Sequence, residues 1–465
     1  MDGVTLPPRL QKALTFIKEW FTVDKAKLKQ ISNRFMKELG KGLQRDGANI
    51  AMNVTWVLGF PTGEEGGKYL TVDLGGTNLR TCMVTLQGRG GKTLVDRKLT
   101  KLPDDIKTGS AERLWNLVVD GIEDFILKHD ITPDGDEPIP LGFTFSYPAV
   151  QDRIDHGVLT TWTKGFDIKG VENEDVVKQL EDALAKRNVL VKVVALINDT
   201  TGAMIASAYK DPATIIGAIF GTGCNAAYME KVGSIPKLKS NLPPDTQVAI
   251  NCEYGAFDNA HQVLPRTVYD KAIDEGSPRP GEQAFEKMSA GLYLGEIYRQ
   301  IMLDFHKRGL VFKEKDVSKL KLAYHLDTEF LSCLENDPIE ERYTRFEEKL
   351  GFKPTEQEMA LSQRLAEIIA VRSARLCACG IAAICKMKGI KSGHVAADGS
   401  VANKNPKFRE RWAAALGEIL DWPEDRASDP IVLTSAEDGS GDGAAIIAAM
   451  TKKRRNEGKV VGEKK

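Results

Sequence analysis

Short apolar strands that run directly into a glycine turn recur along this 465-residue chain, and they constrain its fold more than any other feature. Residues 68–73 lead into a turn at 75–78, after which an extended pattern resumes, so the glycines are predicted to lie in a tight hairpin. Residues 215–220 lead into a turn at 221–223, and residues 225–232 are predicted to return as the second strand of another hairpin. The two halves therefore look like diverged copies of one α/β unit.

Helices and strands alternate between the two hairpins. Apolar residues at helical spacing predict an amphipathic helix over residues 114–126, and a second helix is predicted over residues 174–186. Strands are predicted near residues 92–99, over 139–145 and over 190–197. This alternation is typical of an α/β domain.

The second half of the chain ends in two more units of strand and turn. Residues 393–397 and 431–435 are each a short apolar strand followed by an acidic or small-residue turn. A long helix is predicted before them over residues 361–385, and the arginines that interrupt its apolar pattern favour a buried core helix. Two α/β domains that face each other would create a cleft, which is a common place for a ligand site.

The composition is that of a soluble globular protein. Lysine and arginine number 64 and aspartate and glutamate number 65, so a net charge of −1 offers no global field for nucleic acid or an anionic membrane. Seven cysteines, an odd number over a long chain, indicate reduced thiols and a cytoplasmic protein. Charged residues interrupt positions 1–20, so a signal peptide is not expected.

Two further segments bear on the partners of the chain. The uncharged run at residues 212–229 contains a proline and several glycines, so it is predicted to form strand, loop and strand rather than a membrane span. The basic run at residues 452–455 is predicted to be a solvated helix end, an interpretation favoured over a patch that binds nucleic acid. The expected partners are small molecules, and homodimer formation is left open.

Three glycine turns are candidates for holding a phosphate chain. In a nearly neutral protein an anion must be met locally by backbone N–H groups, which glycine exposes because it has no Cβ. The third turn opens a helix predicted over residues 444–450, whose amino terminus adds partial positive charge. Each turn alone is more often an ordinary hairpin, but all three follow apolar strands. The candidate positions are Gly75, Gly76, Thr77, Asn78, Gly221, Thr222, Gly223, Gly439, Ser440 and Gly441.

Other classes of phosphate-binding protein lack their motifs in this chain. It contains no G-x-x-x-x-G-K-[ST] and neither an H-R-D nor a D-F-G element, which argues against a P-loop enzyme or a protein kinase. Residues 221–226 spell G-x-G-x-x-A, but a nicotinamide-binding turn must open a helix, and the following residues favour a strand. The six histidines are scattered, and Cys377 and Cys379 lack zinc spacing, so a structural transition metal is not expected.

Ordered sequence blocks give the chain a resemblance to a known family. Between Val54 and Met450 they read VDLGGTNLR, LGFTFSYP, WTKGF, INDT, IFGTG, NCEYG, RPG, FEK, ADGS and EDGSG, in that order. The chain resembles the eukaryotic hexokinase family, and it is most similar to fungal members with a single catalytic unit. The resemblance implies the actin-like ATPase fold, a ribonuclease H-like arrangement in which two α/β domains flank a cleft.

The resemblance also implies how the chain is divided and what it does. Residues 65–199 and 443–465 would form a small domain, and residues 1–64 and 200–442 a large domain. Such a kinase transfers the γ-phosphoryl group of MgATP to the 6-hydroxyl of glucose or a related hexose, the first step of glycolysis. The alternative is a sugar-binding regulatory relative without turnover, and the survival of the expected catalytic residues favours the enzyme.

Phosphoryl transfer needs a proton acceptor and groups that screen charge. Asp199 follows an apolar strand and precedes a helical pattern, so its carboxylate is placed at a strand end where it could take the proton of the attacking hydroxyl. The alternative is that Asp199 only caps that helix. By resemblance Asp199 is the general base, Lys164 and Arg80 reach the transferring phosphoryl group, and Asp73 holds Mg²⁺ through water.

A selective hexose site needs several carboxylates and amides around the ring. The residues that match the family's sugar contacts are Ser146, Thr163, Lys164, Asn198, Asn225, Glu253 and Glu286. By resemblance the nucleotide site also includes Asp398, Gly399 and Ser400. Asp442 is a departure, because a neutral or basic residue is expected in the third glycine turn, and a carboxylate there would weaken nucleotide binding unless solvent screens it.

Overall fold

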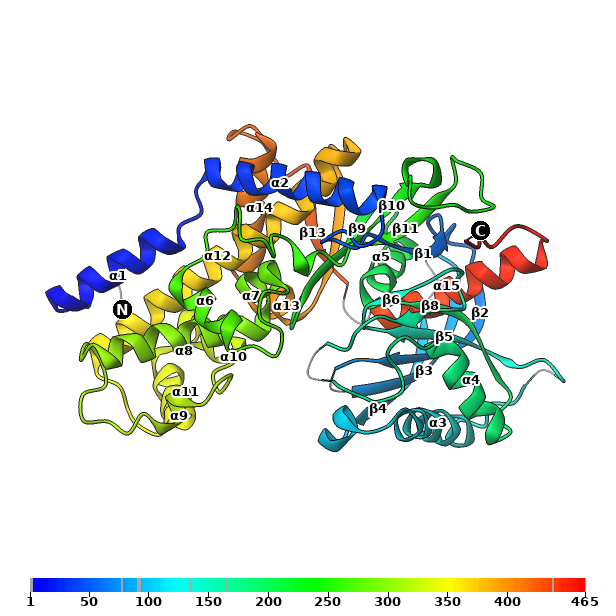
Figure 1. The fold of residues 1–465 in the computed structure, drawn as a ribbon, viewed down its shortest axis with the longest axis horizontal. Coiled ribbons are helices and arrows are strands. Elements are labelled where there is room, and N and C mark those ends of the chain that lie inside the picture. The colour runs from blue at the N-terminus through cyan, green and yellow to red at the C-terminus, as the bar shows by residue number, and fades with distance from the viewer. Residues whose placement is uncertain are drawn as a thin grey trace.

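Two main β-sheets organise the described part of the chain, and each forms the centre of one lobe (Figure 1). The computed structural model describes residues 3–464 apart from 77, 90–92, 134, 164–165 and 437–438. We call the part built on the five-stranded sheet the small lobe and the part built on the six-stranded sheet the large lobe. The helices α5 (Asp199–Lys210) and α15 (Gly439–Asn456) pack between the two sheets.

The small-lobe sheet has the strand order β4-β3-β2-β5-β8. β2, β3 and β4 form an antiparallel meander, whereas β5 and β8 extend the sheet in parallel with β2. Asp73 pairs with Arg80 across β2 and β3, so the first glycine turn closes a hairpin, as predicted. Apolar residues of α3 and α4 share one core with this sheet. The elements are β2 (Gly66–Leu74), β3 (Asn78–Gln87), β4 (Leu94–Lys101), α3 (Ala111–Lys128), β5 (Ile139–Phe145), α4 (Val176–Lys186) and β8 (Val191–Ile197).

The large-lobe sheet has the strand order β1-β11-β10-β9-β12-β13. β9 and β10 are antiparallel with Phe220 opposite Cys224, so the second glycine turn also closes a hairpin, as predicted. β12 and β13 run parallel to β9, and β1 pairs with β11 at the sheet edge. The strands are β1 (Asn53–Leu58), β9 (Thr214–Phe220), β10 (Cys224–Lys231), β11 (Gln247–Asn251), β12 (Gly393–Asp398) and β13 (Ile431–Ser435).

The packing of α15 against its neighbours is close enough to require glycine. A Cβ at Gly443 would lie 2.2 Å from the carbonyl oxygen of Gly202 in α5, and a Cβ at Gly142 in β5 would lie 2.5 Å from the carbonyl oxygen of Ala444. α15 also starts at Gly439, whose added Cβ would lie 2.9 Å from Cα of Ala203. The predicted helix over residues 444–450 therefore begins too far along the chain. Gly439 and Gly443 lie inside α15, where they allow it to pack closely on α5.

A long helix, α12 (Glu356–Lys388), runs through the large lobe. Its length and composition would allow it to cross a membrane, but 83% of its most apolar window is buried inside the protein, as predicted for a core helix. Arg372 within it is fully buried, and its guanidinium donates hydrogen bonds to Asp270 at 2.7 and 2.8 Å. The same guanidinium lies 4.0 Å from the ring centroid of Phe21, so the buried charge is paired and packed.

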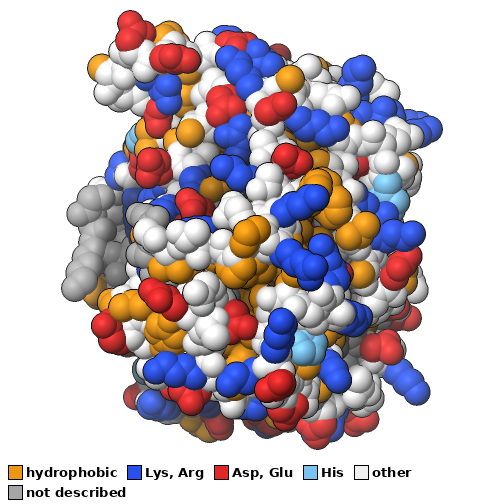
Figure 2. All heavy atoms as spheres, turned by 90° about the vertical axis from the view of Figure 1, so that its left-hand side faces the viewer, with side chains coloured by type: hydrophobic (Ala, Val, Ile, Leu, Met, Phe, Trp, Pro, Cys, Tyr) orange, Lys and Arg blue, Asp and Glu red, His pale blue; other side chains and the backbone are white. Residues whose placement is uncertain are grey.

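Helices make up most of the large lobe outside its sheet (Figure 1). They are α1 (Pro8–Phe21), α2 (Lys25–Gln44), α6 (Val268–Glu275), α7 (Ala284–Ser289), α8 (Gly291–Lys307), α9 (Ser318–Lys321), α10 (Thr328–Asn336), α11 (Ile339–Leu350), α13 (Ser400–Lys404) and α14 (Phe408–Leu420). Figure 2 shows the helical end of this lobe, where positive and negative side chains are interspersed with hydrophobic ones. The mixed signs agree with the near-neutral composition.

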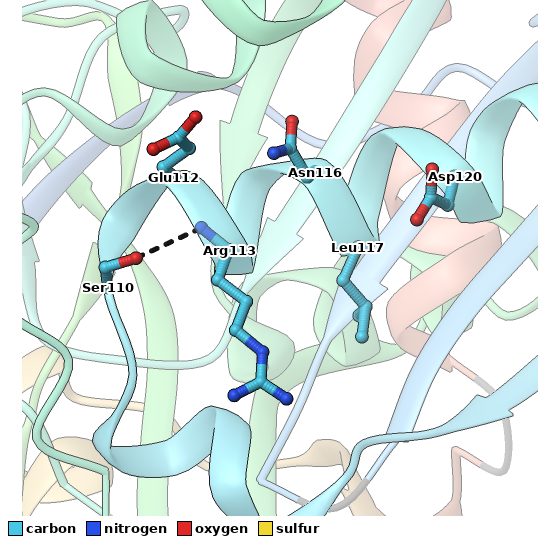
Figure 3. Close-up of a pocket in the computed structure, with 6 residues that line it drawn as sticks. All are labelled: Ser110, Glu112, Arg113, Asn116, Leu117 and Asp120. Atoms are coloured by element: carbon cyan, nitrogen blue, oxygen red, sulfur yellow. Dashed lines mark hydrogen bonds between the residues drawn. The ribbon is translucent and has the colours of Figure 1, made fainter.

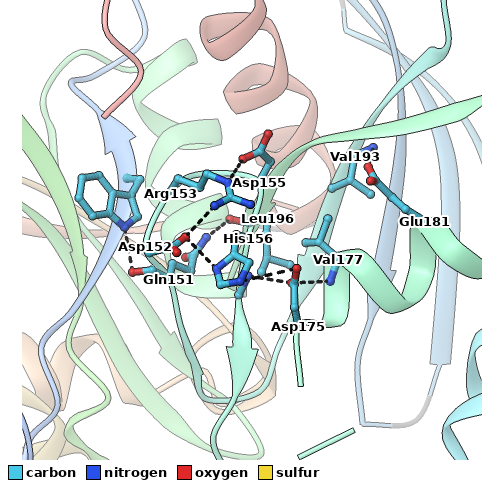
Figure 4. A network of polar contacts seen from close by, with 12 residues as sticks. Gln151, Asp152, Arg153, Asp155, His156, Asp175, Val177, Glu181, Val193 and Leu196 are labelled. Carbon is cyan, nitrogen blue, oxygen red and sulfur yellow. Dashed lines mark hydrogen bonds and ion pairs between the residues drawn. The ribbon is translucent and has the colours of Figure 1, made fainter. Parts of the chain in front are cut away.

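A polar network ties the two lobes together near β6 (Ala149–Val150) (Figure 4). The indole N–H of Trp56 on β1 donates to the carbonyl oxygen of Gln151 at 3.0 Å. The amide of Gln151 donates to the carbonyl oxygen of Leu196 on β8, also at 3.0 Å. Strands of the two main sheets are therefore connected through one residue that follows β6.

The basic run at the end of α15 is paired within the chain. Lys452 lies 3.7 Å from Glu137, Lys453 lies 3.5 Å from Glu64, and Arg455 lies 2.7 Å from Asp155, which Figure 4 labels. Arg454 donates to the carbonyl oxygen of Val460 at 3.2 Å. The run therefore forms the basic last turn of a helix, as predicted.

Candidate active site

Strand ends from both sheets carry the residues that the sequence singled out. β2, β5 and β8 are parallel, so their carboxyl ends lie at the same edge of the small-lobe sheet, with Asp73, Ser146 and Asn198 at those ends. In the large lobe β9 and β12 are parallel, which brings the second glycine turn beside Asp398. The predicted residues therefore fall on corresponding ends of the strands.

The amino terminus of α5 holds Asn198 and Asp199. Asn198 is the cap, because its side-chain oxygen accepts a hydrogen bond from the N–H of Thr201 at 3.2 Å. Asp199 lies in the first turn, where its Oδ1 accepts from the N–H and the hydroxyl of Thr200 at 2.8 and 3.1 Å. The interpretation of Asp199 as only a cap is therefore wrong. The Nδ2 of Asn198 is buried without a hydrogen-bond partner in the described part of the chain, so a donor is left for a ligand.

Amides and a carboxylate form a connected cluster at the start of β10 and after β11. Asn225 Nδ2 donates to Asn251 Oδ1 at 2.7 Å, and Asn251 Nδ2 donates to Glu253 Oε1 at 2.7 Å. The backbone N–H of Glu253 donates to Asn225 Oδ1 at 2.9 Å, which closes the cluster. Glu253 has a φ of 55°, in the left-handed region that a glutamate rarely adopts. Such backbone strain is common at functional sites, where the surroundings hold it in place.

Glu286 on α7 joins the same region. Its Oε2 accepts from the N–H of Cys224 at 3.1 Å, directly after the second glycine turn. A Cβ at Gly223 would lie 2.7 Å from this oxygen, and a Cβ at Gly255 would lie 3.2 Å from the Cβ of Glu286. Burial raises the pKa of the Cys224 thiol, and the charge of Glu286 raises it further, so the thiol stays neutral. The structure therefore brings Asn225, Glu253 and Glu286 to neighbouring positions.

The first glycine turn carries opposite charges on its two strands. Asp73 Oδ2 lies 3.7 Å from a guanidinium nitrogen of Arg80. The hydroxyl of Tyr147 donates to the carbonyl oxygen of Gly75 at 3.0 Å, and the N–H of Gly75 donates to Asn78. Burial raises the pKa of Tyr147, as does the nearby charge of Asp73. The turn is thus fixed to the residue that follows Ser146.

The second glycine turn packs directly on the turn after β12. Gly399 has a φ of 113°, and a Cβ there would lie 2.6 Å from the carbonyl carbon of Phe220. The N–H of Gly221 donates to the carbonyl oxygen of Gly223 at 3.0 Å. Asp398 accepts from the N–H of Gly399 at 2.6 Å and from Asn403 at 3.2 Å. Two of the predicted nucleotide segments are therefore in backbone contact.

Comparison with known proteins covers almost the whole chain. A family profile described as Hexokinase matches residues 13–209, and a second profile with the same description matches residues 215–450. The hexokinase of Emericella nidulans is 55% identical over 98% of this chain and 94% of its own length. Hexokinase-1 of Saccharomyces cerevisiae is 48% identical over 98% of this chain and 96% of its own length. The chain belongs to the hexokinase family.

A solved structure of a relative identifies the fold. The hexokinase from Schistosoma mansoni complexed with glucose superposes with a TM-score of 0.86 at 32% identity, covering 95% of this chain and 99% of that one. The actin-like ATPase fold is thereby confirmed. The chain also aligns with 94–96% of the length of these fungal hexokinases, which confirms that it resembles the fungal members with a single catalytic unit.

Asp442 of this hexokinase is paired within the fold. Its Oδ2 lies 3.4 Å from the Nζ of Lys210 at the end of α5, and its side chain is only 15% exposed. The negative charge is therefore partly compensated by a neighbouring cation. This pairing reduces the repulsion of a triphosphate that the sequence led us to expect.

The structure describes only some of the predicted site residues. Thr77 and Lys164 lie outside the described residues, as does the side chain of Ser440. Thr163 follows Trp162, whose ring lies 4.7 Å from that of Tyr147 in an edge-to-face contact. Trp162, which precedes Thr163, is therefore packed against Tyr147, which follows Ser146.

Two contributors to the site were not singled out from the sequence. Asn251 links Asn225 to Glu253, and Tyr147 holds the first glycine turn. Both lie inside the sequence blocks that carry the resemblance, so these blocks were the signal that could have identified them. Their roles depend on contacts between segments distant in sequence, which spacing alone does not reveal.

The described residues contain neither a cluster of metal ligands nor a reactive thiol. No group of three or more His, Cys, Asp or Glu side chains within them could hold a metal ion. The seven cysteines are buried and unpaired thiols, and burial raises the pKa of Cys82 to about 11. A shallow hollow of about 350 Å³ lies along α3 (Figure 3), lined by Ser110, Glu112, Arg113, Asn116, Leu117 and Asp120. All six line one helix and its cap, so this hollow is separate from the strand-end site.

Proposed function

We propose that this hexokinase transfers the γ-phosphoryl group of ATP to the 6-hydroxyl of glucose and related hexoses, with Mg²⁺ as the metal. The observation that carries the proposal is the start of α5, where Asp199 does not cap the helix and lies next to the unpartnered donor of Asn198. Glucose is supported as the sugar by the relative solved in complex with it. A role in the first step of glycolysis follows from this reaction.

Asp199 is the proposed general base. The N–H and hydroxyl of Thr200 hold its Oδ1, so the orientation of the carboxylate is defined, and Oδ2 is the atom proposed to take the proton of the 6-hydroxyl. Proton removal at this point makes the hydroxyl oxygen a better nucleophile toward the γ-phosphorus.

The proposed sugar contacts lie on both lobes. In the large lobe Asn225, Glu253 and Glu286 supply amide and carboxylate groups for the ring hydroxyls, and Asn251 orients two of them. In the small lobe the proposed contacts are Ser146, Thr163, Lys164 and Asn198. A site with this many directional groups penalises a ligand that leaves them unpaired, which accounts for selectivity toward hexoses.

The nucleotide is proposed to bind along the glycine turns and the turn of Asp398, Gly399 and Ser400. The close approach of two of these segments supports the proposal, because Gly399 lets the turn after β12 meet the second glycine turn, where a Cβ would lie 2.6 Å from the carbonyl carbon of Phe220, and both turns can then face one phosphate chain. Asp73 at the first turn is the proposed carboxylate for Mg²⁺, through water. When bound, Mg²⁺ screens the charge of the phosphates. Arg80 and Lys164 are the proposed cationic contacts of the transferring group.

The division of the chain and its location are part of the same proposal. Residues 65–199 with the carboxy-terminal segment from 443 form the small domain, and residues 1–64 with 200–442 form the large domain. This division is supported by α15, which packs on β2, β5 and β8 of the small lobe. A cytoplasmic location is supported by the unpaired thiols of all seven cysteines.

A coupled assay for ADP release tests the function. Purified protein with ATP, Mg²⁺ and glucose should release ADP only when glucose is present, and fructose and mannose measured alongside define the preference among hexoses. The regulatory alternative predicts glucose binding by calorimetry without ADP release. Binding without turnover in the presence of both substrates would reject the proposed enzyme.

A further inference from the structure

An ion pair joins the two lobes next to the proposed sugar site. Glu172 lies between β7 (Val158–Leu159) and α4 of the small lobe, and Arg279 lies between α6 and α7 of the large lobe. A guanidinium nitrogen of Arg279 is 4.0 Å from Oε1 of Glu172. Val171 packs in the core formed by the small-lobe sheet with α3 and α4, whereas Phe285 packs in a second core cluster, which contains the large-lobe sheet and also residues of β2, β3 and β8. The contact therefore joins segments of the two lobes that pack in different core clusters.

The same carboxylate oxygen fixes the start of a sugar-binding loop. Oε1 of Glu172 accepts a hydrogen bond from the backbone N–H of Trp162 at 2.6 Å. The indole of Trp162 donates to the carbonyl oxygen of Ile168 at 3.0 Å, so the residue is held at its backbone and at its ring. Thr163, a proposed sugar contact, is the next residue. Glu172 thus fixes the backbone of Trp162, directly before Thr163.

Arg279 is built into the unit that carries Glu286. The ammonium group of Lys287 donates to the carbonyl oxygen of Arg279 at 2.8 Å and pairs with Asp274 at 2.7 Å. Asp274 also accepts from the N–H of Gly281 at 3.0 Å, which fixes the segment around Arg279. Because Lys287 directly follows Glu286 in α7, a movement of Arg279 is tied to a movement of that proposed contact.

We infer that Glu172 is a positioning residue for sugar binding, which couples Trp162 to α7 through Arg279 when the two lobes close on a hexose. The inference rests on the proposed function, because it requires a hexose held between the lobes. At 4.0 Å the pair is about 1 Å longer than a charge-assisted hydrogen bond. A small approach of the lobes completes it, and the exclusion of water strengthens it. The pair therefore favours the closed, sugar-bound conformation and leaves the chemical step unchanged.

Glu172→Gln tests the charge alone, because glutamine keeps an acceptor for the N–H of Trp162. We expect the glucose KM and the calorimetric glucose Kd to rise about 3- to 10-fold, with kcat within about twofold, as for loss of uniform binding. Arg279→Gln should give the same change. The double variant should be no weaker than either single variant, since one interaction is lost in all three.

A charge reversal provides the rescue. Glu172→Arg combined with Arg279→Glu should recover affinity relative to Glu172→Arg alone, because both variants lack the acceptor for the N–H of Trp162 and differ only in the charge at position 279. Glu174→Gln, an exposed carboxylate on the same loop, and Glu282→Gln, a partner of Arg279 at 3.7 Å within the large lobe, are controls that should keep the wild-type KM. Thermal melting of each variant separates loss of affinity from loss of folding.

The outcomes separate this inference from the proposed function. If the wild-type protein phosphorylates glucose but Glu172→Gln has the wild-type KM and Kd, the role of Glu172 is overturned and the proposed function stands. Additive effects in the double variant would also overturn the role of Glu172. A wild-type protein that binds glucose without ADP release would reject the proposed enzyme. In that case the glucose Kd values of the same variants would still decide the role of the pair.

Discussion

The two lobes present different chemistry at the proposed site. The small lobe brings charged groups to its strand ends, with Asp73 beside Arg80 and Asp199 at the start of α5. The large lobe brings a closed cluster of amides and a carboxylate around Asn225 and Glu253. The first set suits phosphoryl transfer, and the second suits a ring of hydroxyl groups. The comparison teaches that the largest loss of turnover should come from the small lobe, where the proposed base lies, whereas substitutions in the large-lobe cluster should act mainly on sugar affinity.

The largest effect is expected in the small lobe, at Asp199. Asp199→Ala should lower kcat by about 10²- to 10⁴-fold, because the proposed proton acceptor is lost. Glucose affinity should change much less, since the cluster in the large lobe remains. Steady-state kinetics and glucose calorimetry on one preparation measure both quantities.

Stability provides the control for this variant. Asn198, rather than Asp199, caps α5, so Asp199→Ala keeps the cap and loses only the hydrogen bonds from Thr200, and we expect a folded protein with a modest fall in melting temperature. A well-folded variant that retained most of its kcat would remove Asp199 from the mechanism.

Much of the fold on which this comparison rests could be predicted from the sequence. The strand over residues 68–73 lies in β2, the strand near 92–99 overlaps β4, and the buried helix over 361–385 lies within α12. These segments have strong local signals, since periodicity and turn residues agree there. Both glycine hairpins were predicted for the same reason.

Other features depend on contacts that no local pattern encodes. α15 starts at Gly439 because its glycines pack on α5, whereas glycine ordinarily indicates a loop. β1 joins the large-lobe sheet by pairing with β11, far away in sequence. Within the candidate site, Asp199 was ambiguous between base and cap until the structure placed Asn198 in the capping position.

The next largest effect is expected in the large lobe, at Glu253. Glu253→Ala should weaken glucose binding by about 1 to 3 kcal/mol, because the amides of Asn225 and Asn251 lose a partner. At saturating glucose, kcat should fall far less than in Asp199→Ala. Glucose calorimetry measures the affinity, and a large loss of kcat with unchanged affinity would reverse the assignment of the lobes.

A smaller change is expected at the second glycine turn. Gly223→Ala places a Cβ 2.7 Å from Oε2 of Glu286, so this carboxylate must shift. We expect the glucose KM to rise about fivefold, the size of one weakened hydrogen bond of about 1 kcal/mol. Gly40→Ala in α2, which meets nothing within 4 Å, is the matched control and should keep the wild-type KM. Equal KM values in the two variants would mean that Glu286 does not contact the sugar.

The smallest effect is a dependence of large-lobe stability on pH through Asp274. Burial by itself would raise the pKa of Asp274, but hydrogen bonds from Lys287 and the N–H of Gly281 hold it below its ordinary value. A lowered pKa stabilises the fold above the unfolded value of about 4, and this contribution is lost as the pH falls through the folded pKa. The advantage in melting temperature of wild type over Asp274→Asn should therefore shrink between pH 6 and pH 3. A constant difference across that range would contradict the assignment.

Small-angle scattering with and without saturating glucose tests most directly the claim that the two lobes supply complementary halves of one site. Sugar contacts on both lobes can all be made only when the lobes approach, so glucose should lower the radius of gyration of the wild-type protein. Glu253→Ala should need a higher glucose concentration for the same change. Identical scattering curves for wild type with and without glucose, under conditions where calorimetry shows full binding, would contradict the account.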